Sequence, residues 1–294
     1  MIRAMVWMKN LKALRLHLEA VPDDVLGAAA SIKGLTHFSY RCACGRDPEC
    51  QVAGDLISSI ILNSASTLQT LEVDGANDPI NFLVDWSRIV APEKAIWRGA
   101  MRLKALRSLS LQSLWLFEDF IDLLVRVIPF TRLDELIIGW PLRNEEIFLE
   151  RLADLFTSEQ AKLDGIRLRN LRMEVGCTGA ASDEGLSIRN ARQHFLQSFD
   201  TLTTLEYRVH NTQSKDSREL SASILDAVLK HQKLQRLEIY HLPSDDCDKL
   251  PWPNPLQLAR LMHGLCHLEE FEFVPEPQFV RGFPSIHEQK AHSR

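Results

Sequence analysis

A short pattern of apolar and polar positions recurs along this chain. Each copy has an apolar residue, two variable residues, a second apolar residue, one variable residue and a third apolar residue. The last two apolar positions alternate with polar ones, which is the period of a β-strand with one buried face. Nine copies begin at Leu11, Leu35, Leu68, Leu106, Leu133, Leu163, Leu202, Leu234 and Leu268. The pattern predicts nine short strands, one in about every 32 residues.

Most of the segments between these strands carry apolar residues at helical spacing. One stripe comprises Phe117, Phe120, Ile121, Leu124 and Ile128, and another comprises Ile188, Ala191, Phe195 and Phe199. Candidate helix starts are Asp78-Pro79, Asn144, Ser217 and Asn254-Pro255. The polar run Lys230-His231-Gln232-Lys233 suits the negative end of a helix dipole just before a strand.

Repetition of strand, connection and helix predicts parallel strands with helices on one side. No single unit can bury its own apolar face, so neighbouring units must stack. We therefore predict an α/β solenoid, with a curved parallel sheet and helices on the convex side. It would cover residues 11–275, with an N-terminal cap or remnant over residues 1–10 and a flexible tail over residues 276–294.

These repeats resemble those of leucine-rich-repeat proteins. The copies that begin at Leu106 and Leu163 are closest to the family consensus, because an apolar residue also follows each strand, at Leu114 and Leu171. The long, irregular, helix-bearing units are most similar to the repeat domains of fungal F-box/leucine-rich-repeat proteins. The resemblance implies that the repeats hold a protein substrate for an SCF-type ubiquitin ligase. An F-box start of the Leu-Pro-x-Glu type is not visible in the sequence.

Composition narrows the classes of partner. The chain has 34 Lys and Arg against 39 Asp and Glu, a formal net charge of −5, which disfavours a dedicated nucleic-acid binder. No apolar run reaches the roughly 18 residues that a membrane span needs. The six cysteines are unevenly spaced and predict no disulfide framework. We expect a cytoplasmic or nuclear protein, not a secreted one, with no membrane or nucleic-acid partner; the oligomeric state stays open.

Catalytic and metal-binding patterns are weak. Gly-x-Ser-x-Gly and phosphate-loop motifs are absent. His37, Cys42, Cys44 and Cys50 include ligand types that zinc prefers, but their spacing is not the usual one, so we predict ordinary thiols. We expect no cofactor, no metal and no enzymatic activity. An enzyme or enzyme inhibitor with a convergent site, and a purely structural repeat protein, remain as alternatives.

The best candidate site is the predicted concave face. Side chains that alternate with the buried positions point into this face. The predicted partner-binding residues are Arg167, Arg169, Arg208, Arg236 and Tyr240. Arg and Tyr are favoured at interfaces, and Arg pairs with carboxylate or phosphate, so an acidic or phosphorylated peptide would fit. The alternative is a solvated face of paired charges, since the predicted face also carries Glu206, Glu238, Glu270 and Glu272.

Overall fold

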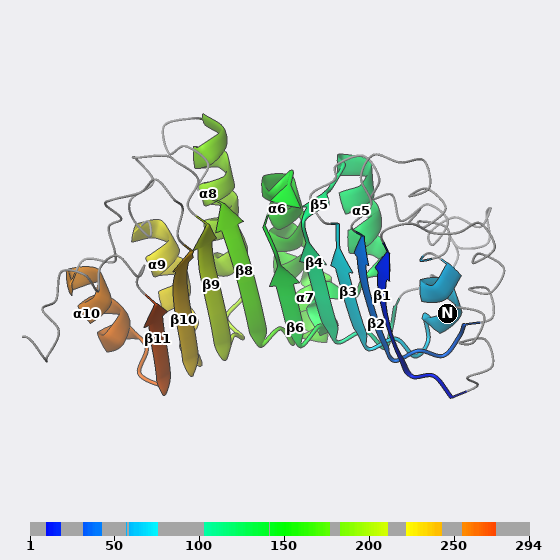
Figure 1. Cartoon of the computed structure of the whole chain (residues 1–294). Coiled ribbons are helices and arrows are strands. Elements are labelled where there is room, and N and C mark those ends of the chain that lie inside the picture. The colour runs from blue at the N-terminus through cyan, green and yellow to red at the C-terminus, as the bar shows by residue number, and fades with distance from the viewer. Residues whose placement is uncertain are drawn as a thin grey trace, which may run out of the picture.

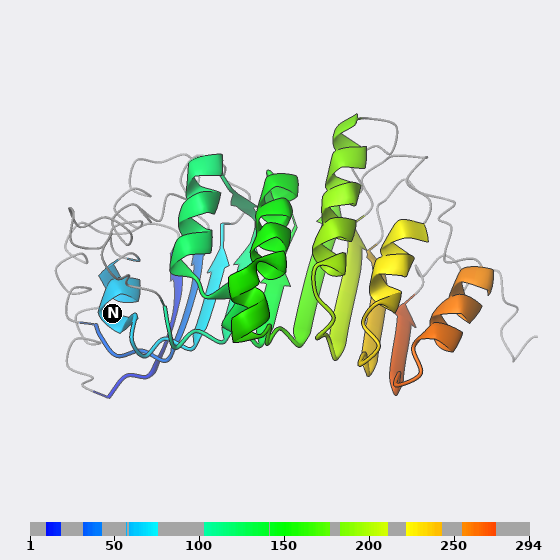
Figure 2. The same ribbon diagram turned by 180° about the vertical axis from the view of Figure 1, so that it is seen from behind.

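The structure is a computed structural model, and it shows an open parallel sheet with helices along one face (Figures 1 and 2). The structure describes residues 10–18, 32–42, 57, 59–75, 103–140, 142–176, 183–210, 222–242 and 255–274. The predicted cap, apart from its last residue, and the predicted tail lie outside these residues, as do the helix starts at Asp78-Pro79 and Ser217. No helix in the described part is long and apolar enough to cross a membrane.

Nine strands form the sheet in the order in which they occur in the chain, and every neighbouring pair is parallel. They are β1 (Ala13–Leu18), β2 (His37–Cys42), β3 (Thr70–Asp74), β4 (Ser108–Gln112), β6 (Glu135–Ile138), β8 (Asn170–Gly176), β9 (Thr204–His210), β10 (Arg236–Leu242) and β11 (Glu270–Val274). The sheet does not close, so β1 and β11 lie at opposite ends. The predicted α/β class and the parallel sheet are therefore confirmed.

The described helices cover one face of this sheet, as Figure 2 shows from behind. They include α5 (Glu118–Val127), the 3-10 helix η3 (Phe130–Arg132), α6 (Glu145–Thr157), α7 (Glu159–Asp164), α8 (Asp183–Gln197), α9 (Ala222–Leu229) and α10 (Pro255–Gly264), and residues 59–64 are also helical. Two short strands, β5 (Leu114–Trp115) and β7 (Leu142–Arg143), pair with each other just before α5 and α6. The opposite face of the sheet carries no helix from the described residues.

A repeated hydrogen-bond arrangement fixes the register of the strands. One carbonyl ahead of each strand accepts two successive backbone N–H groups from the next unit. The Lys12 carbonyl accepts from Thr36 and His37 at 2.8 and 3.0 Å. The same arrangement recurs down to the Gln235 carbonyl, which accepts from Glu269 and Glu270 at 2.8 and 2.9 Å. Equivalent residues of successive units therefore stand side by side across the whole sheet.

The core is continuous from the first unit to the last because each unit adds leucines at equivalent positions. The first apolar position of the pattern is completely buried at Leu35, Leu68, Leu106, Leu133, Leu168, Leu202 and Leu234. Aromatic rings join the helices behind the sheet: Phe156 of α6 lies edge-on to Phe199, with ring centroids 5.2 Å apart, and Phe199 contacts the ring of His231. No subset of the described units has a core of its own.

Three of the predictions made from the sequence are wrong. The sixth strand does not follow Leu163, which lies in α7 with 81% of its surface exposed. Phe117 is not part of the buried stripe, because it precedes α5 and is half-exposed. His231 is not a surface cation at a helix end: it is completely buried, and its Nε2 lies 3.0 Å from the Leu196 carbonyl oxygen.

Candidate binding surface on the open face of the sheet

The functional candidate is the face of the sheet that the described helices leave uncovered, here called the open face. Its side chains alternate along each strand with the buried ones. Because all strands are parallel and in register, these side chains form rows across the sheet. In the part of the sheet formed by β8 to β11, the middle row consists of Arg172, Glu206, Glu238 and Glu272.

Nine residues at this end form a dense group that we call the charged cluster. It consists of Arg172, Glu174, Glu206, Arg208, Arg236, Glu238, Tyr240, Glu270 and Glu272, which come from β8, β9, β10 and β11. Neighbouring strands of a sheet lie about 4.8 Å apart, so charges from different units come within ion-pair distance. The charged cluster thus joins four segments that are far apart in the sequence.

The half of the charged cluster on β8 and β9 is a closed ring of two arginines and two glutamates. Arg172 is hydrogen-bonded to Glu174 on its own strand, and its Nε lies 3.7 Å from Glu206 Oε2. Arg208 is hydrogen-bonded to Glu206, and its Nη1 lies 3.6 Å from Glu174 Oε1. Each guanidinium therefore faces two carboxylates.

Glu238 is the centre of the other half. Its side chain is buried although it stands on the open face, and one carboxylate oxygen accepts a hydrogen bond from Arg236 Nε. The other oxygen accepts from the Tyr240 hydroxyl at 2.7 Å. This hydrogen bond to a carboxylate raises the pKa of Tyr240 well above its usual range. Arg236 also pairs with Glu270, with Nη1 and Oε2 3.3 Å apart.

A cation–π contact connects the two halves. The guanidinium carbon of Arg208 lies 5.1 Å from the centre of the Tyr240 ring. The charged cluster contains three arginines and five glutamates, so its formal charge is −2. The arginines are engaged by these carboxylates, and the excess of charge on this surface is negative.

Three of the five predicted site residues meet in this cluster. Arg208, Arg236 and Tyr240 lie on the predicted strands and face the predicted neighbours. Arg167 and Arg169 do not join them, because β8 begins at Asn170. Both are exposed in the segment that connects α7 to β8, where the backbone N–H of Arg167 donates to the Thr131 carbonyl at 2.9 Å.

Arg172 and Glu174 were not among the predicted site residues, although the spacing of the repeats indicates their position on a strand. Starting the sixth copy at Leu168 in place of Leu163 puts it 35 residues after Leu133 and 34 before Leu202, instead of 30 and 39. The later copies, from Leu202 to Leu268, are 32 and 34 residues apart, so the register at Leu168 is the more regular one.

A second feature of the open face lies at its N-terminal end. A hollow of about 450 Å³ covers parts of β1, β2 and β3, where the small side chains of Ala13 and Ser39 leave space. The charges that line this hollow are paired, with Arg15 Nη2 3.9 Å from Glu72 Oε2. Beyond the hollow, Arg41 Nε lies 3.2 Å from Asp74 Oδ2.

The structure tests the predicted thiol cluster only in part. His37 is at the start of β2, and its Nδ1 lies 2.8 Å from the Thr36 hydroxyl. Cys42 is the last residue of the same strand, whereas Cys44 and Cys50 lie outside the described residues. Within the described part of the chain, no three His, Cys, Asp or Glu side chains are arranged to hold a metal ion.

Comparison with models of known protein families gives no match for this chain, and neither does a search of curated protein sequences.

Proposed function

We propose that this chain is a leucine-rich-repeat solenoid that binds a protein or peptide on the open face of its sheet and has no chemistry of its own. One observation carries the proposal: nine parallel strands in register leave a face that the described helices do not cover, and this face holds the charged cluster. Repeat proteins commonly use such extended faces for binding.

The charge of the cluster favours a partner segment with Lys or Arg side chains. An acidic or phosphorylated peptide would have to take Arg172 and Arg208 from carboxylates that already hold them at close range. A basic segment instead meets a net charge of −2 and the exposed Glu270 and Glu272 at the edge of the cluster. Complementary charge of this kind speeds association and selects partners.

A narrower proposal concerns the pathway. The long, helix-bearing repeats resemble those of F-box/leucine-rich-repeat proteins, and this resemblance alone supports a role in substrate recognition by an SCF-type ubiquitin ligase. Under this proposal the bound protein is a substrate for ubiquitin transfer. An SCF subunit that co-purifies with the chain from native extract would support it.

The test is affinity capture from native extract with matched variants. The open-face variant combines Glu270→Lys with Glu272→Lys, and the control combines Glu150→Lys with Asp154→Lys on α6. All four residues are exposed, and both variants change the charge by the same amount. We expect a partner whose capture falls about tenfold with the open-face variant and is unchanged with the control. If every specific partner is captured equally by both variants, the open face is not the binding surface.

A further inference from the structure

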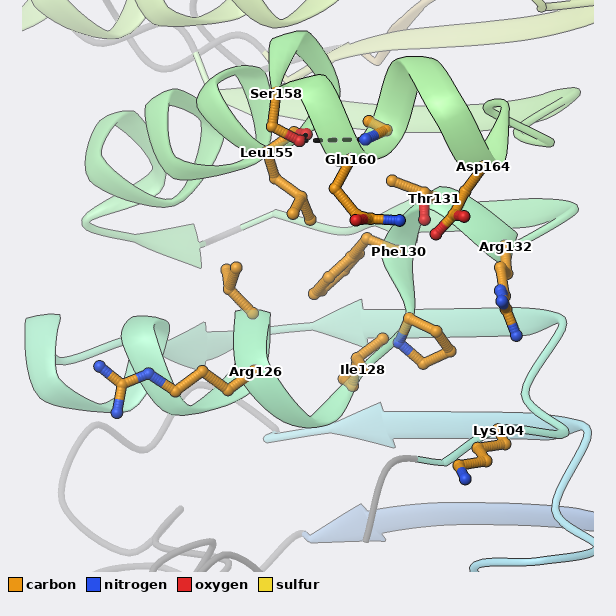
Figure 3. A pocket seen from close by; sticks show the side chains of 13 residues that line it. Lys104, Arg126, Ile128, Phe130, Thr131, Arg132, Leu155, Ser158, Gln160 and Asp164 are labelled. Carbon is orange, nitrogen blue, oxygen red and sulfur yellow. Dashed lines mark hydrogen bonds between the residues drawn. The ribbon is translucent and has the colours of Figure 1, made fainter. Parts of the chain in front are cut away.

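A pocket of about 350 Å³ lies among the helices between η3 and α7 (Figure 3). It forms because α6 is followed at once by the short helix α7, which stands beside the Pro129–Arg132 turn of the preceding unit. Most of the residues that line the pocket belong to α5, η3, α6 and α7. These helices lie behind the sheet, so the pocket is separate from the open face. Its volume is at the lower end of the range for ligand pockets and suits one large side chain.

The floor of this pocket is apolar. Ile128 and Phe130 are buried in the core beneath it, and the half-buried Val125 and Leu155 complete the surface. Figure 3 shows the Phe130 ring and Leu155 between α7 and the end of α5. Such a floor stabilises an apolar group that leaves water, by about 25 cal/mol for each Å² buried.

The rim of the pocket is cationic. Lys104, Arg126 and Arg132 line it, against the single carboxylate of Asp164. In Figure 3, Arg132 and Asp164 lie at one end and Arg126 at the other. Among the residues that the structure describes, neither Lys104 nor Arg132 forms an ion pair. These two differ from the arginines of the charged cluster, each of which has carboxylate partners.

We propose that this pocket binds an acidic segment of a partner protein, with one apolar side chain on the floor and flanking carboxylates on Lys104 and Arg132. Charge complementarity identifies the occupant: three cations and one carboxylate line an apolar pocket, so the best ligand combines an apolar group with negative charge. Arg167 adds a further exposed cation nearby, because its backbone is hydrogen-bonded to Thr131 of the pocket. This second binding surface is independent of the proposal for the open face.

The test uses short capped peptides and the methyl NMR signals of Val125, Ile128 and Leu155. The three probes are Glu-Leu-Glu, Gln-Leu-Gln and Lys-Leu-Lys, titrated into the folded chain of 294 residues. We expect the acidic peptide to shift these signals and to bind about tenfold more tightly than the neutral one, with the basic peptide weakest. Higher salt weakens this preference because the rim charges are exposed to solvent.

Two variants distinguish binding in this pocket from nonspecific electrostatic attraction between the peptide and the chain. Lys104→Gln combined with Arg132→Gln abolishes the preference for the acidic peptide, whereas Lys162→Gln leaves it unchanged. Lys162 is an exposed residue of α7, paired with Glu159, and does not line the pocket. Equal binding of the three peptides, or an absence of shifts at millimolar peptide, overturns the proposal. A fourth probe, 3-phenylpropionate, also overturns it if this small acid binds more tightly than the peptide.

Discussion

Arg192 of α8 and Glu145 of α6 form a buried, bidentate ion pair. Arg192 Nε donates to Glu145 Oε1 at 2.7 Å, and Nη2 donates to Oε2 at 2.9 Å. Only 10% and 4% of the two side chains are exposed. The pair joins helices of successive units, and Glu145 also lies in the first turn of α6, where negative charge is favourable.

Removing one partner of this pair destabilises the fold. We expect Glu145→Gln to lower the free energy of unfolding by about 3 kcal/mol, because the buried Arg192 charge loses the Glu145 carboxylate. The double variant Glu145→Leu with Arg192→Met regains most of that loss. Urea unfolding measures both effects. The control is Glu146→Gln in the same helical turn, and a loss as large there would assign the effect to the helix dipole.

The observed position of β8 predicts a large loss of stability when one leucine is replaced by alanine and almost none when another is replaced. Leu171→Ala opens a cavity in the core, since Leu171 is buried on β8, and costs about 2–5 kcal/mol. Leu163→Ala changes stability by less than about 0.5 kcal/mol, because this side chain is mostly exposed on α7. Thermal or urea unfolding of the two variants decides between the registers: the reverse ranking would restore the strand after Leu163.

The sequence predicted the sheet well because each strand carries its own apolar alternation. The prediction of the sixth strand was wrong for a physical reason. Leu163, Ile166 and Leu168 match the pattern, but Leu163 belongs to the short helix α7. Gly165 ends this helix with a φ of 73° that few other residues adopt. A one-dimensional pattern does not distinguish a leucine at the exposed end of a helix from one at the start of a strand.

The candidate site was harder to predict than the sheet. Placing Arg208, Arg236 and Tyr240 on the open face needed only the strand period. Whether an arginine can bind a partner depends on which carboxylates lie beside it on the neighbouring strands. The register of the strands decides this, and the strand period of one segment does not reveal it. The excess of negative charge depends on the position of β8, because this strand places Arg172 and Glu174 on the open face in place of Arg167 and Arg169. The pocket at η3 and α7 depends on how two helices of different units lie, which no local pattern encodes.

Gly139, the residue after β6, lies close to Gln112 of β4 because glycine has no side chain. A Cβ atom on Gly139 would lie 2.6 Å from Gln112 Cγ and 2.9 Å from Gln112 Cβ. We expect Gly139→Ala to destabilise the chain by about 1–3 kcal/mol, since the strands have to move apart. Chemical denaturation measures this loss.

A second substitution tests the cause of that loss. Gln112→Gly in the Gly139→Ala background removes both side-chain clashes and restores more stability than Gln112→Ala, which removes Cγ but keeps Cβ. A double-variant cycle gives the coupling. Equal rescue by the two substitutions would show that the clash is with the flexible end of Gln112 alone, and no rescue would show that the neighbour is not the cause.

His231 makes the stability of the fold depend on pH. Burial lowers the pKa of this histidine from 6.5 to about 4, so it is neutral in the folded chain. Between these two values the unfolded chain binds a proton that the folded chain does not, and acidification therefore favours unfolding. The loss begins as the pH falls below about 6.5 and is complete near pH 4, and it amounts to about 2 kcal/mol between pH 7 and pH 5.

The pH slope of the free energy of unfolding isolates His231 from the other titrating groups. His231→Leu lowers stability near pH 7, because the Leu196 carbonyl loses its partner, but it removes the slope that His231 contributes between pH 7 and pH 5. His194→Gln, an exposed position on α8, keeps that slope. Urea unfolding at several pH values measures it for each variant. A slope that is the same in His231→Leu as in the wild-type chain would mean that His231 is protonated inside the fold. The hydrogen bond to Leu196 would then have to hold a buried imidazolium, against the cost of its desolvation.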